Sequence, residues 1–222
     1  MSQPDRSTAR RLAADSLARG DAVGWFDELY RHAGDNPRAV PWADLEVNPN
    51  LAAWLETQPL SALGKHALVV GCGLGDDAEE LAACGLQVTA FDVSDTAIAW
   101  CRKRFPHSSV DYVTADLLAL PPAWRGAFSF VFEAYTLQVL PPELRAGAVA
   151  AVAECLAPGG TLLVVARGRD PEDDPGSMPW PLLRTDLQGF RTAGLDRVSF
   201  EDYHDAEDPP VRRFRAVYRR GP

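Results

Sequence analysis

Residues 67–77 read Ala-Leu-Val-Val-Gly-Cys-Gly-Leu-Gly-Asp-Asp, and this stretch decides the fold. A short apolar run ends in three glycines at alternating positions, and two acids and a helical pattern follow. A second apolar run, from Val88 to Phe91, ends in Asp92. A strand, a glycine turn, a helix and a second strand tipped with an acid are typical of a nucleotide-type binding site.

The same rhythm continues along the chain. The apolar runs predict strands near residues 67–71, 87–91, 110–114, 127–132 and 161–166. Helical spacing predicts helices near residues 76–84, 95–104 and 142–156. Because strands alternate with helices, we expect right-handed crossovers, a parallel sheet and an α/β fold. A last helix over 185–193 and an antiparallel pair, 197–203 with 212–218, complete the prediction.

Composition narrows the classes of partner. The 222 residues suffice for one large α/β domain or two small ones, and the formal net charge is −9. An acidic chain argues against nucleic acid or an anionic membrane as partner. The four cysteines form neither a CxxC pair nor a metal-ligand spacing, so we expect no metal site and a reduced, cytoplasmic protein. Neither a signal peptide nor a membrane-spanning run is expected.

The acids after the glycines bear on which ligand binds. A dinucleotide fingerprint needs glycine where Asp76 stands, and a pyrophosphate at this helix N-terminus would be repelled by Asp76 and Asp77. S-adenosylmethionine carries no phosphate, and its sulfonium and ammonium groups favour nearby carboxylates. The pattern therefore favours that cofactor over a dinucleotide.

The ends of the expected strands supply further candidate contacts, because such ends line the ligand crevice of open α/β sheets. Asp92 has two acceptor oxygens for the two ribose hydroxyls. Asp116 ends the third strand and either accepts from the adenine amino group or forms a turn. Leu117 follows with a backbone N–H for the ring, and Glu133 ends the fourth strand facing the cofactor.

Five segments in order make the chain resemble the class I S-adenosylmethionine-dependent methyltransferases. They are residues 68–77, 92–97 (Asp-Val-Ser-Asp-Thr-Ala), 115–117 (Ala-Asp-Leu), 135–145 (Tyr-Thr-Leu-Gln-Val-Leu-Pro-Pro-Glu-Leu-Arg) and 156–161 (Leu-Ala-Pro-Gly-Gly-Thr). Within that class the chain is most similar to the thiopurine, thiol and halide methyltransferases and their tellurite-resistance relatives. One departure is Val69, where many members of the class carry an acid.

The resemblance implies a Rossmann-like three-layer sandwich with a seven-stranded sheet of order 3-2-1-4-5-7-6, its last strand antiparallel. We expect a flexible tail (1–20) and one methyltransferase domain (21–222), made of a helical cap (21–60), a cofactor-binding core (61–166) and an acceptor loop with the C-terminal strand pair (167–222). The predicted cofactor-binding residues are Gly71, Cys72, Gly73, Asp77, Asp92, Val93, Ala115, Asp116, Leu117, Glu133 and Trp42.

Methyl transfer from a sulfonium is an in-line displacement, in which positioning supplies much of the rate. A base is needed only where the acceptor is protonated, and a thiol is partly ionised unaided. Tyr135, just past the fourth strand, is the predicted catalytic residue, although packing over the cofactor is an equally good reading of it. His204 is read as a solvated residue rather than a catalytic one.

Aromatic side chains in the N-terminal part and in the loop after the fifth strand suggest a lid over an apolar acceptor site. The predicted substrate-binding residues are Trp25, Tyr30, Arg167 and Trp180. The sequence thus predicts methyl transfer to a small molecule, with a thiol or other soft nucleophile favoured, by a monomer or weak homodimer. Transfer to oxygen or nitrogen of a secondary metabolite, and a non-catalytic cofactor-binding protein, stay open as alternatives.

Overall fold

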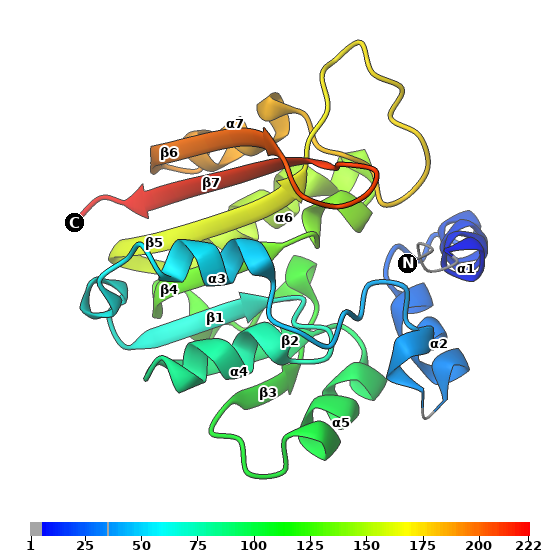
Figure 1. The fold of residues 1–222 in the computed structure, drawn as a ribbon, viewed down its shortest axis with the longest axis horizontal. Coiled ribbons are helices and arrows are strands. Elements are labelled where there is room, and N and C mark those ends of the chain that lie inside the picture. Colours follow the sequence, from blue (N-terminus) through cyan, green and yellow to red (C-terminus); the bar gives the residue numbers. More distant parts are fainter. Residues whose placement is uncertain (1–5, 35) are drawn as a thin grey trace.

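A computed structural model describes residues 6–34 and 36–222 of the chain. Seven strands form one sheet in the order β3-β2-β1-β4-β5-β7-β6 (Figure 1). The strands are β1 (His66–Val70), β2 (Gln87–Asp92), β3 (Asp111–Thr114), β4 (Phe128–Ala134), β5 (Leu156–Arg167), β6 (Leu195–His204) and β7 (Arg212–Arg220). All neighbours pair in parallel except β7, which is antiparallel to both β5 and β6. The predicted fold class and strand order are confirmed.

Helices cover both faces of the sheet and its carboxyl edge. They are α1 (Ser7–Ala18), α2 (Gly24–Ala33), α3 (Pro49–Leu55), α4 (Asp76–Ala83), α5 (Asp95–Arg104), α6 (Pro142–Cys155) and α7 (Arg184–Thr192). Short 3₁₀ turns lie at η1 (Pro37–Ala39), η2 (Leu60–Leu63), η3 (Leu117–Ala119), η4 (Pro122–Trp124) and η5 (Leu137–Val139). Figure 1 shows α1 and α2 beyond the ends towards which the β1 and β4 arrows point.

Two apolar layers hold the sheet between the helices. One face contributes Val69, Phe130 and Val165 to a cluster with residues of α3, α4 and α5. The other contributes Leu68, Val131 and Val164 to a cluster with α6 and α7. Because successive side chains of a strand point to opposite faces, the central strands of a covered sheet need an apolar residue at every position. This requirement explains the unbroken apolar run before the glycines.

Local signals fix the helix that follows β2 and the one that follows β4. The Ser94 hydroxyl accepts from the Ala97 backbone N–H, which caps α5. Pro142 stands at the first position of α6, where its missing N–H costs no hydrogen bond. Both helices therefore begin where the sequence predicts.

The fifth strand begins earlier than the sequence predicts. β5 starts at Leu156, which pairs with Phe128 of β4. The next pair joins Phe130 of β4 to Thr161 of β5, so β5 contains extra residues between the two pairs. The Pro-Gly-Gly turn lies inside this bulge, because an extra loop of chain needs residues that tolerate tight backbone geometry.

The N-terminal segment, expected as a flexible tail with a weak helix as the alternative, contains a helix over Ser7–Ala18. Its apolar face holds Ala9, Leu12 and Ala13, which are buried against Trp25 and Leu29 of α2. Buried apolar contacts between the two helices make α1 part of the cap rather than an extended tail. Residues 1–5 lie outside the described part of the chain. Within that part, no helix is long and apolar enough to cross a bilayer.

Candidate functional site

The glycine loop turns sharply at the carboxyl end of β1. Gly71 has φ +60° and Gly75 has φ +92°, a region that favours glycine. A Cβ at Gly75 would lie 2.5 Å from the Tyr112 hydroxyl, and one at Gly71 would collide with the Thr136 hydroxyl. The loop therefore needs glycine for its backbone angles and for the close approach of its neighbours.

Asp92 lies at the end of β2 beside this loop. Its Oδ2 accepts from the Gly73 backbone N–H at 3.0 Å and its Oδ1 accepts from the Ser94 backbone N–H at 2.9 Å. The side chain is 7% exposed, and burial raises its pKa to about 6. Each carboxylate oxygen keeps one lone pair, because it can accept two hydrogen bonds. Asp92 is thus fixed in place by two amides and can accept from two further donors.

The two acids that begin α4 have different partners. Asp76 forms a bidentate pair with Arg104, at 2.7 and 2.8 Å, which neutralises its charge. Asp77 accepts from the Asn48 backbone N–H at 2.7 Å, and burial raises its pKa to about 6. Of the two acids expected to repel a phosphate, only Asp77 keeps an unpaired charge, because Asp76 is neutralised by Arg104.

The end of β3 lies beside Asp92. The Ala115 backbone N–H donates to the Asp92 carbonyl at 3.0 Å. Val93, the residue after Asp92, is half-buried. Asp116 Oδ1 accepts from the Leu118 backbone N–H at 2.8 Å, so this side chain starts the η3 turn. Leu117 is 6% exposed. The turn-forming reading of Asp116 is confirmed, while its contact with adenine stays a prediction.

Glu133 lies at the centre of the sheet rather than at an open crevice. It is fully buried, in register with Val70 and Val164, and its Oε1 accepts from the Thr136 and Leu137 backbone N–H groups at 2.8 and 3.0 Å. Burial raises its pKa to about 7, and Oε2 has no hydrogen-bond partner in the described chain. Its carboxylate holds the turn that leads to Tyr135, and its expected contact with the cofactor stays a prediction.

Tyr135 follows directly and has φ +64°, a strained angle for an aromatic residue. Its hydroxyl accepts from Asn50 Nδ2 at 3.4 Å, and the Arg213 guanidinium lies 5.2 Å from its ring centroid. Burial raises the pKa of the phenol, and the positive charge of Arg213 opposes that shift. A strained residue held from two sides at the carboxyl edge is a good candidate for a functional role.

The aromatic residues of the cap divide into two groups. Trp25 is 1% exposed and packs on Phe26, while its edge meets Trp42. Its contacts therefore lie inside the cap, and its expected role at the acceptor site stays a prediction. Tyr30 is equally buried, and its hydroxyl accepts from Trp42 Nε1 at 3.0 Å. That hydroxyl lies 3.5 Å from the Cβ position of Gly73, so Tyr30 and Trp42 close over the glycine loop.

Arg167 and Trp180 flank the loop after β5. Both are half-buried, and the Gln138 side-chain oxygen accepts from the Arg167 backbone N–H at 2.9 Å. The Trp180 backbone N–H donates to the Gln138 carbonyl at 2.8 Å, and the Arg145 guanidinium lies 5.8 Å from the Trp180 ring centroid. Gln138 therefore ties this loop to the turn after β4, which brings Arg167 and Trp180 towards Tyr135.

The residues that connect the cap to α5 and to Tyr135 are not indicated by the sequence. Asp27 of α2 accepts from the Ser94 hydroxyl and the Thr96 backbone N–H, which ties the cap to α5. Asn50 receives a hydrogen bond from the Tyr203 hydroxyl and donates to Tyr135. These partners lie 67 to 153 residues apart in the chain, so no local pattern identifies them.

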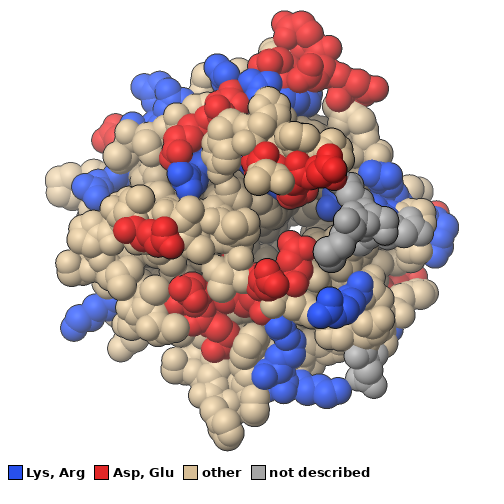
Figure 2. Space-filling view, in the orientation of Figure 1, with Lys and Arg blue, Asp and Glu red and all other residues tan. Residues whose placement is uncertain are grey.

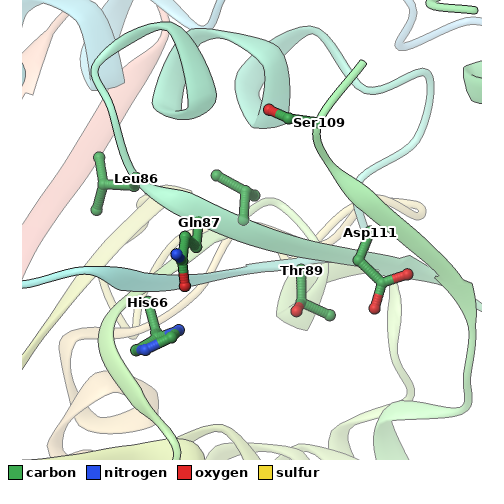
Figure 3. A pocket seen from close by; sticks show the side chains of 7 residues that line it. His66, Leu86, Gln87, Thr89, Ser109 and Asp111 are labelled. Atoms are coloured by element: carbon green, nitrogen blue, oxygen red, sulfur yellow. The ribbon is translucent and has the colours of Figure 1, made fainter. Parts of the chain in front are cut away.

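A separate cavity of about 380 Å³ lies at the opposite edge of the sheet (Figure 3). It is lined by His66, Leu86, Gln87, Val88, Thr89, Ser109 and Asp111. Three of these residues begin β1, β2 and β3, so the cavity is at the amino ends of the strands. The glycine loop and Asp92 lie at the carboxyl ends, where ligands of open α/β sheets bind.

Comparison with known proteins relates the part of the chain that holds the glycine loop to methyltransferases. Residues 67–160 match the family described as Methyltransferase domain. The ubiquinone biosynthesis O-methyltransferase of Thiobacillus denitrificans is 36% identical over 52% of this chain and 49% of its own length. The probable thiol methyltransferase 2 of Arabidopsis thaliana is 27% identical over 73% of this chain and 68% of its own length. The chain thus spans about half the length of the ubiquinone relatives it matches.

The fold has solved counterparts. The N-methyltransferase NodS from Bradyrhizobium japonicum WM9, determined in complex with S-adenosyl-L-homocysteine, has a TM-score of 0.65 and 23% identity, covering 87% of this chain and 96% of that one. Residues 67–160 are therefore a methyltransferase domain, in a chain that has the fold of the class I methyltransferases.

Proposed function

We propose that this protein is an S-adenosylmethionine-dependent methyltransferase that acts on a small molecule. The observation that carries the proposal is the environment of Asp92 beside the glycine loop. Its carboxylate is 7% exposed and accepts from two backbone amides. Burial raises its pKa most, hydrogen bonds from backbone amides lower it, and the negative charge of Asp27 raises it again. No ion pair to Asp92 occurs among the described residues. A buried acid without a cation suits ribose hydroxyls and a positively charged ligand, and it disfavours a phosphate.

The residues in and around the glycine loop fit the cofactor. The proposed contacts are the Asp92 carboxylate for the ribose, residues 71–73 and Asp77 for the methionine part, and residues 115–117 for the adenine. Val69, which replaces an acid of the family pattern, is 2% exposed in the apolar layer, so Tyr30, Trp42 and Asp77 are left to hold the methionine end. When bound, S-adenosylmethionine supplies a methyl group activated by a sulfonium.

The acceptor would bind between Tyr135, Arg167 and Trp180, which the Gln138 contacts bring together. Tyr135 orients the acceptor, and Tyr30 and Trp42 exclude water from the glycine loop. Holding two reactants in line supplies much of the rate of a bimolecular displacement. Figure 2 shows this face hollowed near its centre, with acidic and basic side chains on the rim.

The nature of the nucleophile follows from the lack of a base in the described site. Burial raises the pKa of Tyr135, so its phenol stays protonated at neutral pH and cannot take a proton from the acceptor. Glu133 is buried beneath the turn, and Asp205 pairs with Arg213. We therefore favour a thiol or another soft nucleophile that ionises by itself. Oxygen is the second candidate, because the ubiquinone relatives are named O-methyltransferases.

Calorimetry with S-adenosylhomocysteine tests the binding step, and Asp111→Asn at the opposite edge of the sheet is the matched control. We expect micromolar binding by the unmodified chain and by the control. A panel of thiols, phenols, amines and halide ions, assayed for release of S-adenosylhomocysteine, then identifies the nucleophile. Absence of binding at millimolar ligand would contradict the proposal, and turnover of phenols but not of thiols would replace sulfur with oxygen.

A further inference from the structure

Arg167 and Arg6 have no ion-pair partner in the described part of the chain. Arg167 ends β5 and Arg6 precedes α1, and both side chains are half-buried. Among the residues that the structure describes, no carboxylate lies within 4.0 Å of either guanidinium, whereas Arg212, Arg213 and Arg215 of β7 each have such a partner. Removing a charge from water without a partner is costly. The two guanidiniums therefore favour an anionic ligand.

The two charges lie close enough to affect one another. Burial lowers the pKa of Arg6, and the positive charge of Arg167 lowers it further. Arg167 is also directly opposite Arg213 in the β5–β7 pair, and like charges in that position repel. Burial and then the charge of Arg213 lower the pKa of Arg167. Arg167 and Arg213 thus place two guanidiniums opposite each other at the end of β5, in a chain whose formal net charge is −9.

The nearby acids Asp205 and Glu207 form ion pairs with Arg213 rather than with Arg167 or Arg6. Asp205 pairs with Arg213 at 2.6 Å and also accepts from two backbone amides, and Glu207 pairs with the same arginine. Glu207 and Asp44 oppose part of the charge felt by Arg6, without forming an ion pair with it. Asp205 and Glu207 likewise oppose part of the charge felt by Arg167. The three guanidiniums and three carboxylates thus balance in number, and what the Arg167 side chain lacks among the described residues is a hydrogen-bonded partner, which a carboxylate would supply with a smaller charge than a phosphate dianion.

We infer that Arg167 binds the carboxylate of the methyl acceptor, so that the acceptor is a small carboxylic acid whose nucleophile lies at Tyr135. The inference deepens the proposed function and rests on it for the identity of the reaction. A planar guanidinium matches a carboxylate with two parallel hydrogen bonds. The Tyr135 backbone N–H donates to the Val165 carbonyl at 3.0 Å, two residues before Arg167. Arg167 is opposite Arg213, whose guanidinium lies 5.2 Å from the Tyr135 ring centroid, so a bound anion would lie next to the reacting centre.

The test is binding of matched acids and amides to the full chain with S-adenosylhomocysteine present. The probes are benzoate with benzamide, phenylacetate with phenylacetamide, and 4-mercaptobenzoate with 4-mercaptobenzamide, followed by tryptophan fluorescence. We expect at least one acid to bind about tenfold more tightly than its amide. Arg167→Gln should reduce that preference to less than about threefold, and Arg6→Gln should have a smaller effect. Arg125→Gln is the control, since this arginine belongs to an exposed ion pair with Glu154.

Equal binding of acids and amides in all three pairs would overturn the inference, as would a preference that survives in the Arg6→Gln, Arg167→Gln double variant. Failure of the proposed function looks different, because S-adenosylhomocysteine itself would then not bind. In that case the acid and amide titrations are repeated without it, and they still measure whether Arg167 selects a carboxylate. Circular dichroism of each variant confirms that loss of preference does not come from unfolding.

Discussion

The two ends of the proposed site hold their polar groups in different ways. The glycine end comprises residues 71–77 and Asp92, and the arginine end comprises Arg167, Arg213 and their neighbours at β5 and β7. At the glycine end, backbone amides fix a carboxylate that is 7% exposed. At the arginine end, the contacts are between side chains: Arg213 forms ion pairs with Asp205 and Glu207 and lies over the Tyr135 ring.

The difference separates two tasks. Backbone amides do not titrate and have few conformations, so the glycine end is preformed for one ligand. Long side chains carry charge and can be exchanged without changing the backbone, so the arginine end can set which acceptor binds. Variants of the glycine end should therefore change cofactor binding, and variants of the arginine end should change the acceptor only.

The largest effect is expected for Asp92→Asn. The amide keeps the size of the side chain and one acceptor oxygen, but it introduces an NH₂ group opposite a backbone N–H donor. We expect affinity for S-adenosylhomocysteine to fall about 100-fold or more, which corresponds to about 2.7 kcal/mol. Calorimetry measures this loss, with Asp111→Asn as the control. An unchanged affinity would mean that Asp92 only holds the loop.

Asp92→Ala would affect folding as well as cofactor binding. That variant leaves the amides of Gly73 and Ser94 without their buried acceptor, at a cost of about 1–3 kcal/mol of folding free energy per unsatisfied group. Loss of binding in Asp92→Ala therefore combines a destabilised loop with a lost ligand contact, and Asp92→Asn separates the two.

The sequence predicts the glycine end well because that end is local. The glycines, Asp92 and the Ser94 cap lie within two strands and a turn, and each has a conformational reason for its residue type. The arginine end depends on the register of β7 against β5, which places Arg213 beside Tyr135. No short-range pattern encodes that register. The role of Trp25 is hard to predict for a related reason, since an aromatic residue on a helix has the same spacing in a core or on a lid.

Arg213→Gln is the corresponding change at the arginine end. It leaves Asp205 and Glu207 without their partner and removes the cation over Tyr135. Because breaking a buried ion pair costs about 3–5 kcal/mol, we expect the free energy of unfolding to fall by about 3 kcal/mol. The kcat/KM for the acceptor should fall about 30-fold, while the Kd of S-adenosylhomocysteine changes less than twofold.

Urea unfolding and release of S-adenosylhomocysteine measure the two effects of Arg213→Gln. The control is Arg184→Gln, since the Arg184 side chain is 55% exposed in its pair with Asp202 and should have little effect. A large loss of cofactor affinity in Arg213→Gln would remove the distinction between the two ends.

A smaller effect is expected for Tyr135→Phe. The change removes the hydroxyl that accepts from Asn50 and keeps the ring beneath Arg213. If the hydroxyl orients the acceptor, kcat falls about tenfold while cofactor affinity and thermal stability stay close to those of the unmodified chain. An unchanged kcat would support the alternative that the ring only packs over the cofactor. Tyr203→Phe, which removes the other hydroxyl on Asn50, is the matched control.

The smallest predicted effect is a difference in pH dependence between the ends. Burial raises the pKa of Asp92 to about 6, so lowering the pH from 7 to 5 protonates it and removes an acceptor for the ribose. We expect the affinity for S-adenosylhomocysteine to fall about fivefold over this range and to be constant above pH 7. The arginine end should show no such slope for a carboxylic acid ligand between pH 5.5 and 7.5, because guanidiniums stay charged. Calorimetry at four pH values tests both statements, and Asp92→Asn should abolish the slope. A slope that persists in that variant would assign the titration to Asp77, whose pKa is also about 6.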